Sequence, residues 1–104
     1  MIRASFFYPA APGGRFDFDY YLGRHVPMAR RLLEGVGLLR MEIDRGVSGE
    51  EPGSFPLYVC VAHLYFTSAE AFYAAMETVG DELGCDVPNY TDGDIETQVS
   101  EIVD

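Results

Sequence analysis

Apolar and polar residues follow two periods along the chain, which predict four strands and two helices. Ile2–Tyr8 is a short run rich in aromatic residues that ends at a turn of prolines and glycines, and it predicts the first strand. From Asp17, the expected N-cap, apolar residues recur every three or four positions, as on one face of a helix. Pro27 lies within this stripe and is expected to kink or split the helix. The stripe consists of Phe18, Tyr21, Leu22, His25, Met28, Ala29, Leu32 and Leu33.

The middle of the chain predicts two strands joined by a polar loop. Between Leu38 and Val47 apolar and charged residues alternate, which is typical of a half-buried strand. Residues 48–54 are expected to form a hairpin connection or a mobile flap. Residues 56–66 are apolar at both alternating sets of positions, as in a central strand that is covered on both faces.

The last third of the chain predicts one more helix and one more strand. Residues 67–70, Thr-Ser-Ala-Glu, have the spacing of a capping box at a helix start. The helix is expected to stop at Gly80 and to be followed by a turn-rich segment from Asp81 to Thr91. Alternation from Ile95 to Ile102 predicts the last strand. The stripe of this second helix consists of Phe72, Ala75, Met76 and Val79.

The resulting order, β-α-β-β-α-β, is that of an α+β ferredoxin-like fold, with two helices on one face of a four-stranded antiparallel sheet. The other face of such a sheet has no helix to cover it. Because the third strand is apolar on both sides, two copies are expected to pack sheet on sheet as a homodimer, and space left between the sheets would be a cavity. The 104 residues are expected to form one domain over 1–104.

Charge and residue types exclude several functions. Seventeen acidic residues against seven basic ones give a net charge of −10, which opposes binding to nucleic acid or to anionic membranes. All basic residues are arginines, so lysine nucleophiles and a Walker phosphate loop are excluded. No spacing pairs two good metal ligands and no glycine-rich nucleotide motif follows a strand, so no metal and no organic cofactor are expected. Without a leader or a spanning segment the protein is expected to be cytoplasmic, with Cys60 as a reduced core thiol.

Four motifs occur in a fixed order along most of the chain. They are Tyr8-Pro9, then Phe16-Asp17 through Tyr20-Tyr21 to His25-Val26-Pro27, then Phe66-Thr67-Ser68-Ala69-Glu70-Ala71-Phe72, and finally Asp86-Val87-Pro88-Asn89-Tyr90-Thr91-Asp92. Together they resemble the EthD family, which is named for a protein of ethyl tert-butyl ether degradation. The resemblance implies ferredoxin-like domains that dimerise into an α+β barrel. Arg24 stands where many members have the first of two histidines, so no histidine pair is expected here.

The resemblance also implies small-molecule chemistry. The wider superfamily includes cofactor-independent monooxygenases, polyketide cyclases, muconolactone isomerases and haem-handling proteins, which place a ligand between sheet and helix. We therefore expect an oxidoreductase, isomerase or cyclase that acts on a small apolar or aromatic metabolite. The alternatives are a non-catalytic carrier and a haem-binding protein with His25 or His63 as axial ligand.

His25 is the candidate catalytic residue. It lies on the inner stripe one turn after Tyr21, and an imidazole transfers protons near neutral pH. The alternative is a buried histidine bonded to a backbone carbonyl.

The candidate substrate-binding residues are polar or aromatic side chains near the expected cavity. His63 and Tyr65 are placed on the strand face toward the second copy, where His63 either binds ligand or bonds across the dimer to Gln98 or Ser100. Asn89 and Tyr90, in the last loop, either close the cavity or organise the turn. Tyr8, at the end of the first strand, either points at a ligand or fills the core. The full set is Tyr8, Tyr21, His63, Tyr65, Asn89 and Tyr90.

Overall fold

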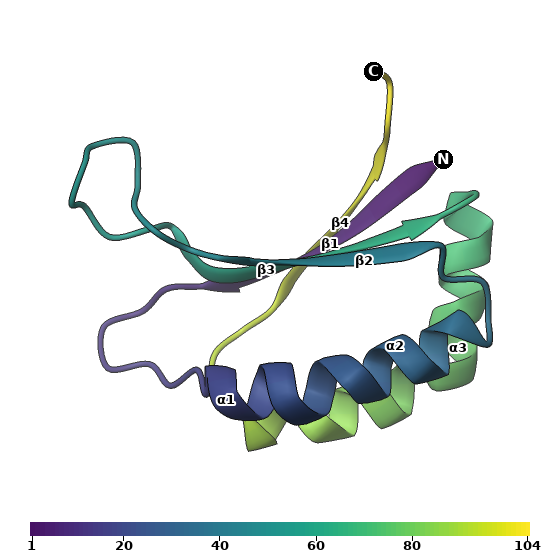
Figure 1. The fold of residues 1–104 in the computed structure, drawn as a ribbon, viewed down its shortest axis with the longest axis horizontal. Coiled ribbons are helices and arrows are strands. Elements are labelled where there is room, and N and C mark those ends of the chain that lie inside the picture. The colour runs from purple at the N-terminus through teal and green to yellow at the C-terminus, as the bar shows by residue number, and fades with distance from the viewer.

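The computed structural model describes residues 1–104 as one antiparallel sheet with helices on one face (Figure 1). The strands are β1 (Ile2–Pro9), β2 (Arg40–Arg45), β3 (Tyr58–Phe66) and β4 (Glu96–Glu101), in the order β2-β3-β1-β4. The helical segments are α1 (Phe18–Tyr20), η1 (Tyr21–His25), α2 (Val26–Glu34), α3 (Ala69–Asp86) and η2 (Val87–Asn89). The predicted ferredoxin-like fold and its order of elements are confirmed.

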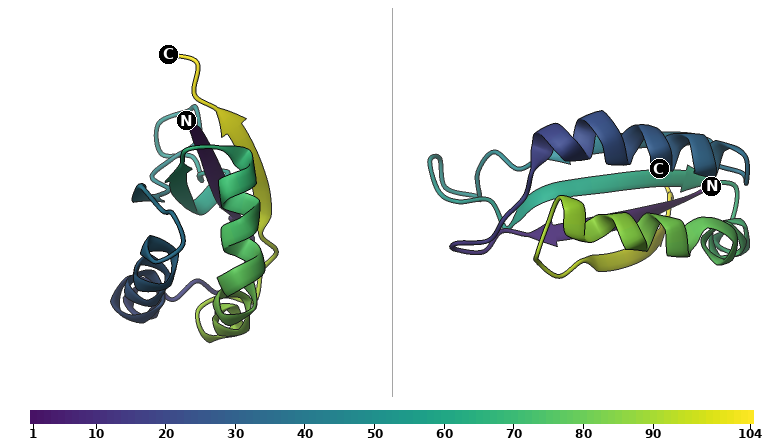
Figure 2. Two further views of the ribbon diagram at one scale, coloured as in Figure 1. Left: turned by 90° about the vertical axis from the view of Figure 1, so that its right-hand side faces the viewer. Right: turned by 90° about the horizontal axis from the view of Figure 1, so that it is seen from below.

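The main core lies between the sheet and the two long helices. Figure 2 shows α2 and α3 side by side on the same face of the sheet. Leu33 of α2 and Phe66 of β3 have no exposed surface, and Phe72 of α3 is almost fully buried. Burying a side chain of this size contributes about 1.5–3 kcal/mol, so the inward faces of these elements hold the layers together. No helix in the structure has the length and apolar character to cross a membrane.

The first helix is continuous but contains one widened turn before Pro27. Asp17 caps the helix as predicted, because its side chain accepts a hydrogen bond from the Tyr20 N–H at 3.0 Å. In η1 the Val26 N–H bonds to the Tyr21 carbonyl five residues earlier, which is π-helical geometry. Pro27 has no N–H to donate and its ring crowds the preceding turn, so the expected kink takes the form of this wider turn. The rings of Tyr21 and His25 stack on its inner side.

The second helix is longer than the sequence pattern indicated. The prediction that it stops at Gly80 is wrong, because α3 continues to Asp86. Leu83 is buried and extends the apolar stripe by one turn, which outweighs the cost of about 0.5–1 kcal/mol for a glycine within a helix. The N-cap is Ser68, whose Oγ accepts a hydrogen bond from the Ala71 N–H at 3.1 Å.

The open face of the sheet carries a polar network at its centre. His63 bonds through Nδ1 to Ser5 Oγ at 2.9 Å and through Nε2 to Asp44 Oδ2 at 2.8 Å. These bonds within the chain take the place of the bond across a dimer to Gln98 or Ser100 that the sequence suggested. The reason is that β2, which borders β3, supplies a carboxylate on this face.

Tyr65 belongs to the same open face. Its hydroxyl donates to Glu42 Oε1 at 2.7 Å, and the Arg40 guanidinium lies 4.1 Å from the centre of its ring. The face is therefore mixed in polarity and not uniformly apolar, as the strand pattern alone had implied.

Replacing Ser68 with alanine should lower the free energy of unfolding by about 1 kcal/mol, because the Ala71 N–H loses its cap. Urea denaturation measures this loss as a lower midpoint at unchanged slope. Thr67→Ala is the matched control and should change stability by less than about 0.5 kcal/mol. A larger loss for Thr67→Ala than for Ser68→Ala would contradict the assignment of the cap.

Candidate functional site

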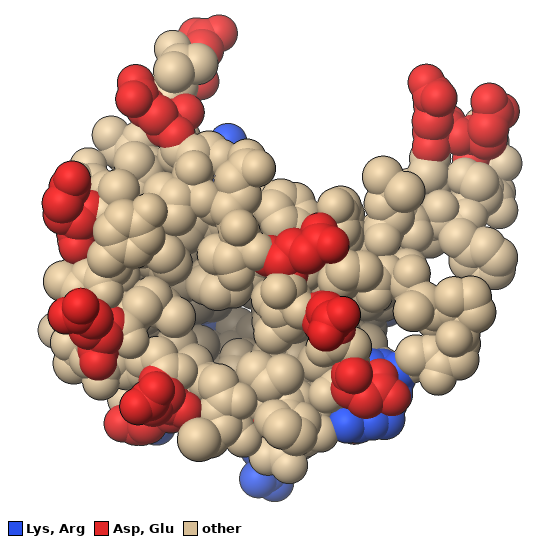
Figure 3. Space-filling model, turned by 180° about the vertical axis from the view of Figure 1, so that it is seen from behind, with Lys and Arg blue, Asp and Glu red and all other residues tan.

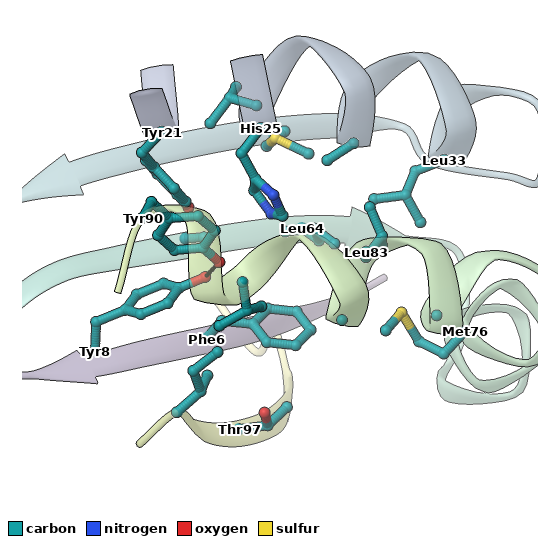
Figure 4. Close-up of a pocket in the computed structure, with 18 residues that line it drawn as sticks. Phe6, Tyr8, Tyr21, His25, Leu33, Leu64, Met76, Leu83, Tyr90 and Thr97 are labelled. Carbon is teal, nitrogen blue, oxygen red and sulfur yellow. Dashed lines mark hydrogen bonds between the residues drawn. The ribbon is translucent and has the colours of Figure 1, made fainter. Parts of the chain in front are cut away.

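A cavity of about 240 Å³ lies between the sheet and the helices (Figure 4). Phe6 and Leu64 line it from the sheet, Leu33 from α2, and Met76 and Leu83 from α3. Of its 18 lining residues 14 are hydrophobic, so the cavity suits a compact apolar ligand. It lies within one chain on the helix side of the sheet, as the family resemblance implied, and not between the sheets of two copies.

The cavity opens between α3 and β4. Gly84 of α3 and Thr97 of β4 line the cavity and are also exposed to solvent, so they border its mouth. Figure 3 shows the hollow on this side of the molecule, with acidic side chains spread over the face around it. None of the arginines lines the cavity, so it offers no cation to an acidic ligand. The charge distribution favours a neutral ligand.

His25 is buried at one end of the cavity and is held by a carboxylate. Its Nδ1 lies 2.9 Å from Asp86 Oδ2, and the residue is 7% exposed. An ionised carboxylate only accepts hydrogen bonds, so Nδ1 carries the proton and Nε2 of the neutral ring has a free lone pair. No protein group bonds Nε2, and the ring lines the cavity. With Nδ1 bonded to Asp86, the nitrogen that can accept a proton from whatever occupies the cavity is Nε2.

Asp86 is fixed by two further donors. Its Oδ1 accepts from the Tyr20 hydroxyl at 2.6 Å and from Asn89 Nδ2 at 3.0 Å. Partial burial raises the pKa of Asp86, but the bonds from Tyr20, Asn89 and His25 outweigh burial and lower the pKa below its ordinary value. The carboxylate is therefore charged at neutral pH. Because its pKa is lower in the folded state, its bonds stabilise the fold at neutral pH, and that contribution is lost as the pH falls through the folded pKa.

Two buried tyrosines, Tyr21 and Tyr90, pack against the histidine, and a third, Tyr8, packs against both of them. The hydroxyls of Tyr8 and Tyr90 are 2.9 Å apart, and the rings of Tyr21 and Tyr90 pack with their centres 4.8 Å apart (Figure 4). Burial raises the pKa of all three hydroxyls, so they remain protonated. Within the Tyr8–Tyr90 pair one hydroxyl donates to the other, which leaves one hydroxyl proton to donate elsewhere. Burial also raises the pKa of Cys60 beside them to about 12, so it stays a thiol.

The structure brings together four of the seven residues proposed from the sequence. They are Tyr8, Tyr21, His25 and Tyr90, and all line the cavity. Asn89 does not line it and instead bonds Tyr20 and Asp86. His63 and Tyr65 lie on the other face of the sheet, because alternation along β3 turns Ala62 and Leu64 toward the cavity.

Asp86 is the site residue that sequence reasoning missed. It stands in the last motif quoted for the family resemblance, but the expected helix end at Gly80 left it in an undefined turn. Only a helix that continues to Asp86 brings its carboxylate to the first helix.

The site does not fit the haem alternative. A porphyrin needs a wider slot than a cavity of about 240 Å³, which lies below the usual range for drug-sized ligands. His63 has both ring nitrogens bonded within the chain. No group of three His, Cys, Asp or Glu side chains is arranged to hold a metal ion.

Replacing Asp86 with asparagine should move the proton of His25 from Nδ1 to Nε2. The asparagine Oδ1 keeps the donors Tyr20 and Asn89, so its amide nitrogen faces His25 and donates to Nδ1. Nitrogen-15 NMR of the imidazole reports which nitrogen carries the proton. A variant that keeps the Nδ1–H form would contradict the role of Asp86, and Asp81→Asn on the exposed side of α3 is the matched control.

Comparison with known proteins agrees with this architecture. The EthD domain model matches residues 15–94. An EthD-like protein from Ralstonia eutropha JMP134 is 38% identical, with 99% of this chain and 92% of that chain covered and a TM-score of 0.92. An ethyl tert-butyl ether degradation (EthD) family protein from Bacillus halodurans C-125 is 20% identical, covers 99% of both chains and has a TM-score of 0.77.

A dimeric ferredoxin-like protein from an uncultured marine organism shares the fold at 15% identity, with 99% and 94% of the two chains covered and a TM-score of 0.55. No curated protein matches the chain. The family model spans most of the chain and the Ralstonia protein aligns along nearly all of it, so the chain belongs to the EthD family.

Proposed function

We propose that the protein is a cofactor-independent enzyme that transfers a proton on a small apolar or aromatic metabolite, with His25 as the general base. The observation that carries this proposal is the free Nε2 of His25, which faces an apolar cavity while Nδ1 is bonded to a charged Asp86. A carboxylate bonded to the far nitrogen orients the ring and stabilises the imidazolium that forms when Nε2 takes a proton.

The tyrosine hydroxyls can donate a hydrogen bond to the carbonyl oxygen of the substrate. A substrate with an acidic C–H next to a carbonyl loses the proton to Nε2, and the electron pair of the C–H bond moves to the carbonyl oxygen. The Tyr8–Tyr90 pair supplies a neutral donor near this end of the cavity, and burial keeps both hydroxyls protonated. A donor that is fixed before the reaction stabilises the enolate oxygen as its charge develops. Where a C=C bond is conjugated with the enolate, return of the proton to the far carbon of this dienolate moves the double bond and is an isomerisation.

Deuterium exchange tests this proposal directly. 1-Indanone, a compact aromatic ketone, should exchange its α-hydrogens in D₂O faster with the protein than in buffer. His25→Phe and His25→Gln should each lose about 100-fold or more of the enzymatic rate, because neither supplies a base. Mass spectrometry follows the exchange, and circular dichroism verifies that each variant folds.

The two variants separate catalysis from a structural role. Glutamine can still bond Asp86, so a structural histidine would be rescued by His25→Gln and not by His25→Phe. Tyr73→Phe, at an exposed tyrosine on α3 outside the cavity, is the control and should leave the rate unchanged. Binding of 1-indanone without exchange above buffer would contradict an enzyme and favour the carrier alternative.

The open sheet face supports a homodimer as the working form. Phe7 and Val61 are half-buried on this face, and the ring of Phe7 packs on Tyr58 with centres 4.9 Å apart. A second copy would remove this apolar surface from water by a two-fold symmetric contact. The ferredoxin-like protein from an uncultured marine organism, which has the same fold, is dimeric, and this supports a dimer for this chain as well.

Light scattering at micromolar concentration should give a mass twice that of one chain. Val61→Glu should shift the protein to a monomer, because it places a buried charge beside Asp44 on the same face of the sheet. Val103→Glu in the exposed C-terminal segment is the control and should stay dimeric. A wild-type monomer, or a Val61→Glu dimer of unchanged stability, would overturn the proposed dimer.

A further inference from the structure

Two glycines of α3 border the cavity where a core helix ordinarily carries large side chains. Gly80 and Gly84 are one helical turn apart and both line the cavity, beside Met76 on the same side of the helix. The neighbouring stripe of α3, which includes Val79 and Leu83, is filled and buried. Part of the cavity is therefore the space that side chains at positions 80 and 84 would otherwise fill.

Neither glycine is required by the backbone. Both lie in regular helix without a positive φ angle. A Cβ at position 84 would meet no atom within 4 Å, and one at position 80 would meet only the Met76 side chain, at 3.6 Å. Alanine would fit at both positions and would stabilise a helix interior relative to glycine. The fold itself therefore gives no reason for glycine, whereas the cavity does.

A second observation connects these glycines with a ligand. His25 is more than nine-tenths buried, and its Nε2 faces the same cavity without a protein partner. The same cavity is lined by His25 and by both glycines, and its mouth is bordered by Gly84 and Thr97. One polar acceptor in a cavity with otherwise apolar walls is typical of a site for a ligand with a single polar end.

We infer that Gly80 and Gly84 determine ligand specificity by forming a groove in which an unbranched or flat apolar tail lies. This inference rests on the proposed function, because it takes the cavity as the ligand site. The ligand class is a neutral hydrocarbon chain or aryl group with one hydroxyl or carbonyl at its buried end. The tail extends toward the mouth, so its length and thickness at Gly84 decide which ligands are accepted.

Alkylbenzenes test the groove without the proposed chemistry, because they have no carbonyl and no acidic C–H next to one. NMR titration of toluene and n-hexylbenzene should show tighter binding of the longer compound to the wild type. Gly84→Leu should weaken the binding of n-hexylbenzene by about tenfold or more, because an added side chain of this size excludes the tail. The binding of toluene should be weakened much less. Gly84→Ala should give a smaller loss in the same direction.

The variants also separate loss of binding from loss of folding. Gly84→Ala should raise the melting temperature of the protein while it weakens the binding of n-hexylbenzene. Damage to the fold cannot produce this combination. Gly23→Ala is the matched control, because its Cβ also meets no atom within 4 Å but the residue lies outside the cavity. It should leave binding of both compounds unchanged.

If Gly84→Leu lowers the affinity for the two compounds equally, or lowers neither, the inference is overturned. It is also overturned if the wild type does not bind n-hexylbenzene more tightly than toluene. His25→Phe should keep the preference for n-hexylbenzene. A protein that shows this preference and its loss in Gly84→Leu, but does not exchange the hydrogens of 1-indanone, would refute the proton transfer and retain the groove.

Discussion

The hydrogen bond between His25 and Asp86 joins the first helix to the end of α3 and gives the cavity its chemical character. It fixes the proton of the imidazole on Nδ1, and thereby leaves an acceptor at the cavity end that is otherwise apolar. Tyr20 and Asn89 keep the carboxylate in place from the other side. Without this bond the ring could rotate or change tautomer, and the cavity would hold an ordinary buried histidine.

The helical geometry around the site consists of two departures from a regular core. The wide turn of η1 brings Tyr21 and His25 onto one inner face, with their rings stacked. In α3, glycines replace bulky residues along the wall of the cavity. Both departures cost stability, since wide turns and helical glycines are less favourable than a regular helix with alanine. Both departures lie next to the cavity, whereas the core beside it is filled by large side chains.

The two faces of the sheet differ in what they contact. The inner face, with Phe6 and Leu64, forms the core and one wall of the cavity. The outer face has a hydrogen-bonded network of Ser5, His63 and Asp44 and an apolar region next to it. Side chains alternate between the two faces along β1 and β3. His63 on the outer face is therefore separated by the sheet from His25, which lies on the helix side. The polar network thus belongs to the surface proposed for dimerisation and not to the ligand site.

The sequence by itself determined the order of elements, the inward face of the first helix and the inward position of His25. These follow from periodicity and capping, which act over a few residues: Asp17 caps its helix as predicted, and His25 lies one turn after Tyr21. The family resemblance added the location of the cavity between sheet and helix.

Only the tertiary structure decided which groups meet His25. Asp86 is 61 residues away in sequence, and its position depends on α3 continuing past Gly80. Local propensity argued against that continuation, because glycine is a poor helix former. Burial of Leu83 in the core reversed the local preference. The strand pattern placed His63 and Tyr65 on the face away from the helices, and the structure agrees. Only the tertiary structure decided that the cavity lies on the opposite face, within one chain, because the helices leave space above Ala62 and Leu64.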